Sequence, residues 1–172
     1  MHKAVYPGSF DPLTYGHLDI IQRASGMFDA VTVLVIRNSA KKSLFSVEER
    51  VQMIEKVLKK RGFENVSVDT YEGLTINYCL EHDIGVSIRG LRAVTDFEYE
   101  LQIAQTNSVF SKGRLDTVFL TTSLKYAYLS STIVKEIASY HGDVSVCVPK
   151  TVEKKLIEKY GTKESDKRGS RV

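Results

Sequence analysis

Short apolar runs alternate along this chain with segments whose apolar residues recur at helical spacing. Strand-like runs, most of them rich in β-branched residues, occupy positions 4–6, 31–36, 66–71, 84–89 and 116–122. Uninterrupted runs of this length are typical of parallel strands that helices cover on both faces. The pattern therefore predicts five buried strands.

Helical periodicity fills the intervals between these runs. From Gly16 onward, Leu18, Ile21, Ala24 and Phe28 recur at the spacing of one helix face. Further helices are predicted from residue 46 to a cap at residue 62, over 74–82, from residue 95 to at least 109, after a cap at 130–132, and over 151–160.

The helix that begins near residue 46 has the clearest boundaries. Ser46 and Glu49 have the spacing of a capping box, in which the hydroxyl accepts from the Glu49 amide while the carboxylate reaches back. Gly62 follows the last apolar position and is a suitable C-cap.

Strands that alternate with helices across short loops predict the fold class. We expect an α/β, Rossmann-like, doubly wound and mostly parallel five-stranded sheet. Ligands of such sheets bind at the carboxyl ends of the strands. The pattern further predicts a single domain over residues 1–161 and a disordered basic tail over residues 162–172.

Composition and charge narrow the function classes. No apolar run approaches the roughly 20 residues of a transmembrane helix, and the N-terminus carries no signal-peptide core, so we expect no membrane association and a cytoplasmic location. The net charge is +3, of which the tail 162–172 supplies +2. A nearly neutral body argues against a nucleic-acid-binding surface.

Cys79 and Cys147 lack metal-ligand spacing and are predicted to be reduced core residues.

Residues 8–17 join the first strand to the first helix, where backbone amides and the helix dipole favour an anion. The spacing fits neither of the two common glycine-rich phosphate loops. Gly16 permits close approach of the backbone, and His17 on the first turn can donate to a phosphate oxygen. A lone His after a Gly more often caps a turn, but the string Thr14-Tyr15-Gly16-His17 resembles the T/H-x-G-H signature of the nucleotidylyltransferase superfamily.

Three more segments at the predicted ligand edge carry suitable groups. Arg89 and Arg92 flank Gly90 after a buried strand and can bind phosphate through charge-assisted hydrogen bonds, or form ordinary surface ion pairs. Lys41 follows the second strand and can reach a phosphate, or remain a solvated loop charge. The segment 126–132 offers hydroxyls and amides for a triphosphate and aromatic rings for adenine, or a simple N-cap.

Taken together, these segments resemble the bacterial phosphopantetheine adenylyltransferase family over about residues 3–160. The strings that carry the resemblance are residues 6–12, 16–21, 45–50, 88–100 and 129–138. The segment 88–100 is the most specific of them, whereas the histidine motif identifies only the superfamily.

The resemblance implies a role for each matching residue. His17 would stabilise the transition state at the α-phosphate. The residues implied to bind ATP are Ser9, Phe10, His17, Gly90, Leu91, Arg92, Glu100, Tyr126, Ala127, Tyr128, Leu129, Ser130, Ser131 and Thr132. Those implied to bind 4′-phosphopantetheine are Ser9, Lys41, Thr75, Arg89 and Asn107, with Lys41 and Arg89 on its phosphate. Three positions differ from the commonest family pattern: Ser9 replaces Thr, Tyr15 replaces Asn and Thr132 replaces Ser.

The implied reaction needs no protein nucleophile. The acceptor phosphate attacks the α-phosphorus of ATP in line and pyrophosphate leaves, so positioning and donor groups suffice. The resemblance also implies Mg²⁺ bound through the substrate phosphates, with no protein metal site, as well as a homohexamer and feedback inhibition by coenzyme A.

Three other readings have to be weighed at this point. A different transferase of the superfamily would use another acceptor, such as glycerol phosphate or nicotinate mononucleotide, and the segment 89–100 argues against it. A non-catalytic nucleotide- or nucleic-acid-binding module would leave the pairing of His17 with two arginines unexplained. A class I aminoacyl-tRNA synthetase shares the histidine motif, but the chain lacks room for tRNA-binding domains.

Overall fold

The computed structural model describes residues 2–37, 42–92 and 94–161, and the expected tail 162–172 lies outside them. Five parallel strands form one sheet in the order β3-β2-β1-β4-β5, which confirms the predicted doubly wound α/β class. The strands are β1 (Lys3–Gly8), β2 (Ala30–Ile36), β3 (Val66–Tyr71), β4 (Val86–Leu91) and β5 (Asp116–Thr121). The helices are α1 (Tyr15–Ser25), α2 (Val47–Arg61), α3 (Thr75–Glu81), α4 (Val94–Phe110), α5 (Ser131–Ser139) and α6 (Lys150–Tyr160).

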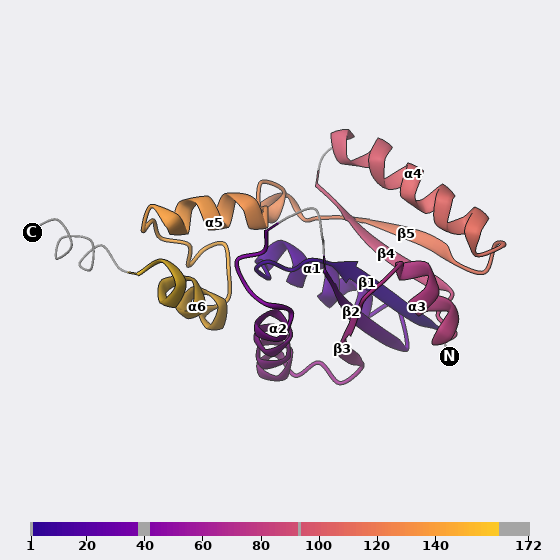
Figure 1. Ribbon diagram of the computed structural model, residues 1–172, viewed down its shortest axis with the longest axis horizontal. Coiled ribbons are helices and arrows are strands. Elements are labelled where there is room, and N and C mark those ends of the chain that lie inside the picture. The colour runs from indigo at the N-terminus through magenta and orange to yellow at the C-terminus, as the bar shows by residue number, and fades with distance from the viewer. Residues whose placement is uncertain (1, 38–41, 93, 162–172) are drawn as a thin grey trace, which may run out of the picture.

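The two faces of the sheet belong to separate apolar cores because successive strand residues point to opposite sides. Ala4 and Tyr6 join a large core with residues of α1, α2, α5 and α6, whereas Val5 between them joins a smaller core with residues of α3. Figure 1 shows α5 and α6 together beyond the carboxyl ends of the strands and α4 along the β4–β5 edge.

The predicted boundaries of α2 are confirmed. The Ser46 hydroxyl accepts from the Glu49 amide at 3.2 Å, and the Glu49 carboxylate accepts from the Ser46 amide at 2.8 Å. Gly62 ends the helix with φ of 71°, a left-handed conformation that glycine adopts without a Cβ penalty.

Two features depart from the sequence pattern. The strand expected at 84–89 lies at Val86–Leu91, because Ile84 closes α3 through a hydrogen bond from its amide to the Cys79 carbonyl. A short 3₁₀ helix, η1 (Leu124–Tyr126), was not predicted, since three residues carry no periodicity. Cys79 and Cys147 are both free and buried, as predicted for core residues.

The central strands β1 and β4 separate after two paired positions. Their paired register covers only Ala4 with Val86 and Val5 with Ser87, whereas β1 and β2 are paired over the whole of Lys3–Gly8. The strand order reverses between β1 and β4, because the chain places β2 and β3 on one side of β1 and then crosses to place β4 and β5 on the other. Open α/β sheets bind ligands at such a switch point.

Among the residues that the structure describes, no helix has the length and apolar character needed to cross a bilayer.

The packing of α2 against the sheet gives a stability test. Ile54 is fully buried between α2 and the large core, so Ile54→Ala should lower the free energy of unfolding by about 2–5 kcal/mol. Ile157 on α6 is 44% exposed, and the same change there should cost less than about 1 kcal/mol. Urea unfolding of both variants measures the difference, and equal losses would contradict this packing.

Candidate active site

A cleft of about 370 Å³ opens at the carboxyl ends of β1 and β4, where the two strands separate. The N-terminal turns of α1 and α5 form its other walls. Its lining residues are Tyr6, Pro7, Gly8, Ser9, Phe10, Thr14, Gly16, His17, Arg89, Gly90, Arg92, Glu100, Thr122, Leu129, Ser130, Ser131 and Thr132.

The loop after β1 turns back on itself at Phe10. Phe10 has φ of 46° and is 2% exposed, and its ring meets Tyr6 edge-on at 5.4 Å between centroids. A Cβ on Gly8 would lie 3.0 Å from this ring, so any larger residue there would require the ring to shift. Phe10 thus fills the base of the loop and leaves the backbone of residues 8 and 9 at the cleft wall.

His17 lies in the first turn of α1 and is held by the helix cap. Its Nδ1 accepts a hydrogen bond from the Thr14 amide at 3.0 Å, with the Thr14 hydroxyl 3.1 Å away. A backbone amide can only donate, so Nδ1 carries no proton and the neutral ring has its proton on Nε2. The ring packs edge-on against Phe10 at 5.1 Å, which fixes its plane.

The surroundings of His17 keep its ring neutral. Burial and the nearby Arg92 guanidinium lower the pKa of His17 from 6.5 to about 4. At neutral pH the side chain is therefore a hydrogen-bond donor without a positive charge. Such a group can stabilise charge that develops on a phosphate oxygen and does not itself need to exchange a proton.

Arg89 on β4 is oriented by Glu100 on α4. Its Nε and Nη2 donate to the two carboxylate oxygens of Glu100 at 2.5 and 2.6 Å, and Nη1 donates to the Pro7 carbonyl at 3.2 Å. Burial alone would lower the pKa of Arg89, but the paired carboxylate outweighs it and raises that pKa. This bidentate pair fixes the guanidinium between the separated strands β1 and β4.

The start of α5 closes the cleft opposite α1. Ser130 caps the helix by accepting from the Ile133 amide at 3.1 Å, as predicted for this segment. Amides in the first turn of a helix have no partner within it, so this wall favours an anion. Arg92 reaches the same wall and donates to the Leu129 carbonyl at 3.4 Å.

The structure brings most of the sequence-predicted residues to this one cleft. The predicted residues that line it are Ser9, Phe10, His17, Arg89, Gly90, Arg92, Glu100, Leu129, Ser130, Ser131 and Thr132.

The other predicted residues lie elsewhere. Leu91 and Ala127 line a neighbouring cavity of about 610 Å³, which shares Arg92 and Thr122 with the cleft. Tyr126 stacks on Tyr15 at 6.0 Å, and Tyr128 is 61% exposed. Thr75 begins α3 and Asn107 lies on α4, both half-buried outside the cleft lining. Lys41 falls outside the described residues.

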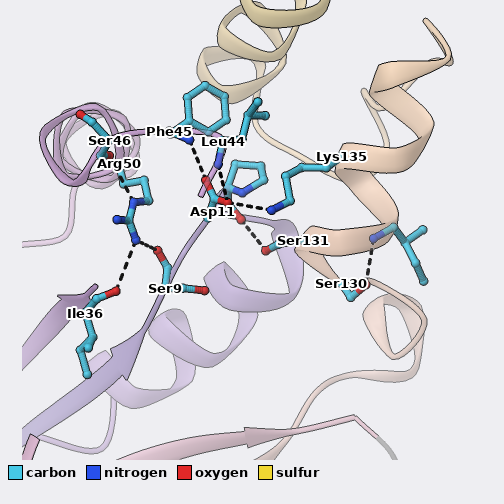
Figure 2. Close-up of polar contacts among 12 residues, drawn as sticks. Ser9, Asp11, Ile36, Leu44, Phe45, Ser46, Arg50, Ser130, Ser131 and Lys135 are labelled. Carbon is cyan, nitrogen blue, oxygen red and sulfur yellow. Dashed lines mark hydrogen bonds and ion pairs between the residues drawn. The ribbon is translucent and has the colours of Figure 1, made fainter. Parts of the chain in front are cut away.

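Sequence reasoning did not assign a role to Tyr6, which lies at the base of the cleft. Burial raises the pKa of Tyr6, so its hydroxyl is neutral. Asp11, Arg50 and Lys135 were missed as well, although they tie the cleft loops together (Figure 2). Each of them lies within a string that carries the family resemblance (6–12, 45–50 and 129–138), but only their three-dimensional contacts show what they do.

No three His, Cys, Asp or Glu side chains gather into a possible metal site in the part of the chain that the structure describes. The donors of the cleft are amides, hydroxyls, an imidazole N–H and guanidinium groups, which suit phosphate oxygens rather than a metal ion.

Comparison with known families agrees with this chemistry. The model of the cytidylyltransferase-like family matches residues 5–137. A phosphopantetheine adenylyltransferase of Lachnoclostridium phytofermentans is 51% identical over 96% of this chain and all of its own length. That of Geobacter sulfurreducens is 54% identical over 91% of this chain and 94% of its own.

Solved structures support the fold. A putative nicotinate-nucleotide adenylyltransferase from Vibrio parahaemolyticus superposes with a TM-score of 0.67 at 18% identity, covering 92% of this chain and 93% of its own. The nicotinic acid mononucleotide adenylyltransferase of Plasmodium falciparum, complexed with NaAD, gives 0.69 at 13% identity, covering 92% and 95%.

The state of His17 can be measured directly. In ¹⁵N NMR of histidine-labelled protein, we expect the Nε2–H tautomer at pH 7 and protonation with a midpoint near 4. The unfolded chain binds this proton more readily, with a pKa near 6.5, so His17 makes the fold less stable as pH falls from about 6.5 toward 4. A midpoint near 6.5 would contradict the buried, neutral ring.

Proposed function

The chain belongs to the phosphopantetheine adenylyltransferase family, and we propose that it transfers AMP from ATP to 4′-phosphopantetheine, releasing pyrophosphate and dephospho-coenzyme A, a step of coenzyme A biosynthesis. The observation that carries the proposal is the fixed, neutral imidazole of His17 in a cleft shared with Arg89 and Arg92.

His17 acts at the reacting α-phosphate. The acceptor phosphate attacks the α-phosphorus in line, the bond to the bridging oxygen of pyrophosphate breaks, and negative charge builds on the α-phosphate oxygens. The Nε2–H of His17 donates to one of these oxygens. Because Thr14 and Phe10 already hold the ring in place, little reorganisation is needed when the charge develops.

The two substrates bind against different walls of the cleft. The start of α5 and Arg92 hold the phosphates of ATP, and its adenosine extends toward Leu91 and the segment 126–129. Arg89, fixed by Glu100, binds the acceptor phosphate together with Lys41, and Ser9 lies between the two phosphates. Thr75 and Asn107 line the path of the pantetheine arm.

Mg²⁺ would be held at the cleft through the substrate phosphates. When bound, it would neutralise part of the charge of the triphosphate. The donor set of the cleft fits this arrangement, because its groups complement phosphate oxygens and leave the ion to them.

The family resemblance further supports a cytoplasmic homohexamer that coenzyme A inhibits. Outward-facing apolar residues offer a surface for contact between copies; they are Phe97, Tyr99, Val109 and Phe110 on α4 and Leu74 just before α3. Coenzyme A differs from the product by one phosphate, so it fits the same cleft.

The acceptor is tested by following pyrophosphate release with ATP and one acceptor at a time. We expect turnover with 4′-phosphopantetheine and Mg²⁺, and none above background with glycerol phosphate or nicotinate mononucleotide. Turnover with another acceptor alone would place the chain elsewhere in the superfamily. ATP binding without release in any mixture would indicate a non-catalytic module.

Replacing His17 tests the mechanism. His17→Ala should fold normally and lose about 10²- to 10³-fold in kcat, because one donor to the transition state is gone. His2→Ala is the matched control, since His2 is exposed at the opposite end of β1. Circular dichroism and pyrophosphate release on the three proteins give the answer, and near-normal turnover of His17→Ala would rule out the assigned role.

A further inference from the structure

A buried carboxylate lies just behind the cleft without lining it. Asp11 follows Phe10 in the loop after β1 and is 4% exposed. A buried charge is costly unless it is paired and hydrogen-bonded. Its partners therefore indicate what it does.

Three segments of the chain converge on Asp11 (Figure 2). Its Oδ1 accepts from the Phe45 amide at 2.9 Å, and its Oδ2 accepts from the Leu44 amide at 3.0 Å. Oδ2 also accepts from Lys135 Nζ at 2.7 Å. One side chain thus joins the loop after β1 to the end of the loop between β2 and α2 and to α5.

Each joined segment leads to the cleft. The loop after β1 contributes Ser9 and Phe10 to its lining. Residues 42–45 directly follow Lys41, which we assign to the acceptor phosphate. Lys135 lies one turn beyond the start of α5, and Ser131 ties the same turn to the loop by donating to the Pro12 carbonyl at 2.7 Å.

Arg50 secures the other end of the connection. This side chain is 1% exposed, and its Nη1 donates to the carbonyls of Ser9 at 2.6 Å and Ile36 at 3.4 Å. Ile36 is the last residue of β2, so Arg50 ties the end of this strand to the loop after β1. Arg50 bonds to this loop and to Ile36, and Asp11 in the same loop bonds to Leu44.

We propose that Asp11 is a positioning residue for adenylyl transfer, holding the acceptor-side loop through Leu44 and Phe45 and the ATP-side helix α5 through Lys135. Asp11 thereby fixes the position of the wall that binds ATP relative to the wall that binds the acceptor. The loop that carries Ser9 and Phe10 lies between them. This inference rests on the proposed function, because the acceptor side and the ATP side are defined by it.

Asparagine has nearly the same shape and cannot replace this carboxylate. Two backbone amides and an ammonium group all donate to Asp11, and an amide side chain has only one oxygen to accept them. Its NH₂ group would face another donor. Burial by itself would raise the pKa of Asp11, but Lys135 and the two amides outweigh it and lower that pKa, so the carboxylate is ionised at neutral pH.

The two substitutions that remove parts of this cluster should have different kinetic signatures. Lys135→Met removes only the link to α5, so kcat/KM for ATP should fall while KM for 4′-phosphopantetheine stays near the wild-type value. Asp11→Asn weakens both links, because one oxygen cannot accept from both amides and the ammonium group. KM for 4′-phosphopantetheine should therefore rise as well, with a total loss of about 10²-fold, the scale of a 1 Å misplacement. The double variant should lose less than the product of the two single losses, because one carboxylate serves both contacts.

Asp143→Asn is the matched control. Asp143 is exposed, and its carboxylate accepts from the Ser145 amide at 2.8 Å outside the cleft lining, so the same chemical change should leave both KM values unchanged. Thermal unfolding of each variant, followed by circular dichroism, separates lost structure from lost positioning.

The outcomes are distinct. An equal loss for both substrates in both variants, or unchanged kinetics, would overturn the role of Asp11 while an active wild-type protein upholds the proposed function. A wild-type protein that releases no pyrophosphate would overturn both. If Asp11→Asn does not fold, Lys135→Met decides alone: a loss confined to ATP supports the role, and a loss shared by both substrates overturns it.

Discussion

The early separation of β1 from β4 is the constraint on which the rest of this structure depends. The two strands are paired at Ala4 and Val5 only, and beyond that point the sheet offers β1 a neighbour on the side of β2 alone. The gap that results is the cleft, and strand ends, loops and helix starts form its walls. Such walls need other interactions to fix their positions, because a continuous backbone ladder does not reach across them.

Charged side chains supply those interactions. Arg89 bridges the gap itself, donating to Pro7 on β1 and, in bidentate fashion, to Glu100 on α4. Behind the cleft, Asp11 and Arg50 connect the loop after β1 to the segment between β2 and α2. Charge-assisted hydrogen bonds are shorter and stronger than neutral ones and have defined directions, which suits a site whose groups must meet two phosphates at once.

The strands and helices of the fold could be predicted from the sequence, whereas the detailed geometry of the cleft could not. Apolar runs and the capping box of Ser46 and Glu49 are local signals, and the sheet and α2 form as they indicate. The Thr14 to His17 string likewise predicted a donor at the start of a helix. The tautomer of His17 depends on the Thr14 amide and its low pKa on burial and Arg92, which are properties of packing. Asp11, Arg50 and Lys135 are far apart in the chain, so no spacing rule could have connected them.

The neutrality of His17 also explains how positive charge is distributed around the reacting centre. Two guanidinium groups already face the cleft, and a third cation on the imidazole would repel Arg92 at the place where the substrates must approach. The two solved structures that share this fold are named a putative nicotinate-nucleotide adenylyltransferase and a nicotinic acid mononucleotide adenylyltransferase, so the fold by itself does not select the acceptor. Under the proposed function, that choice falls to the groups around the acceptor phosphate and its arm, among them Arg89, which Glu100 orients, and the loop held by Asp11. Within that proposal, the neutral imidazole at the centre serves adenylyl transfer and the guanidinium groups at the walls serve substrate binding, so the two tasks fall to separate side chains.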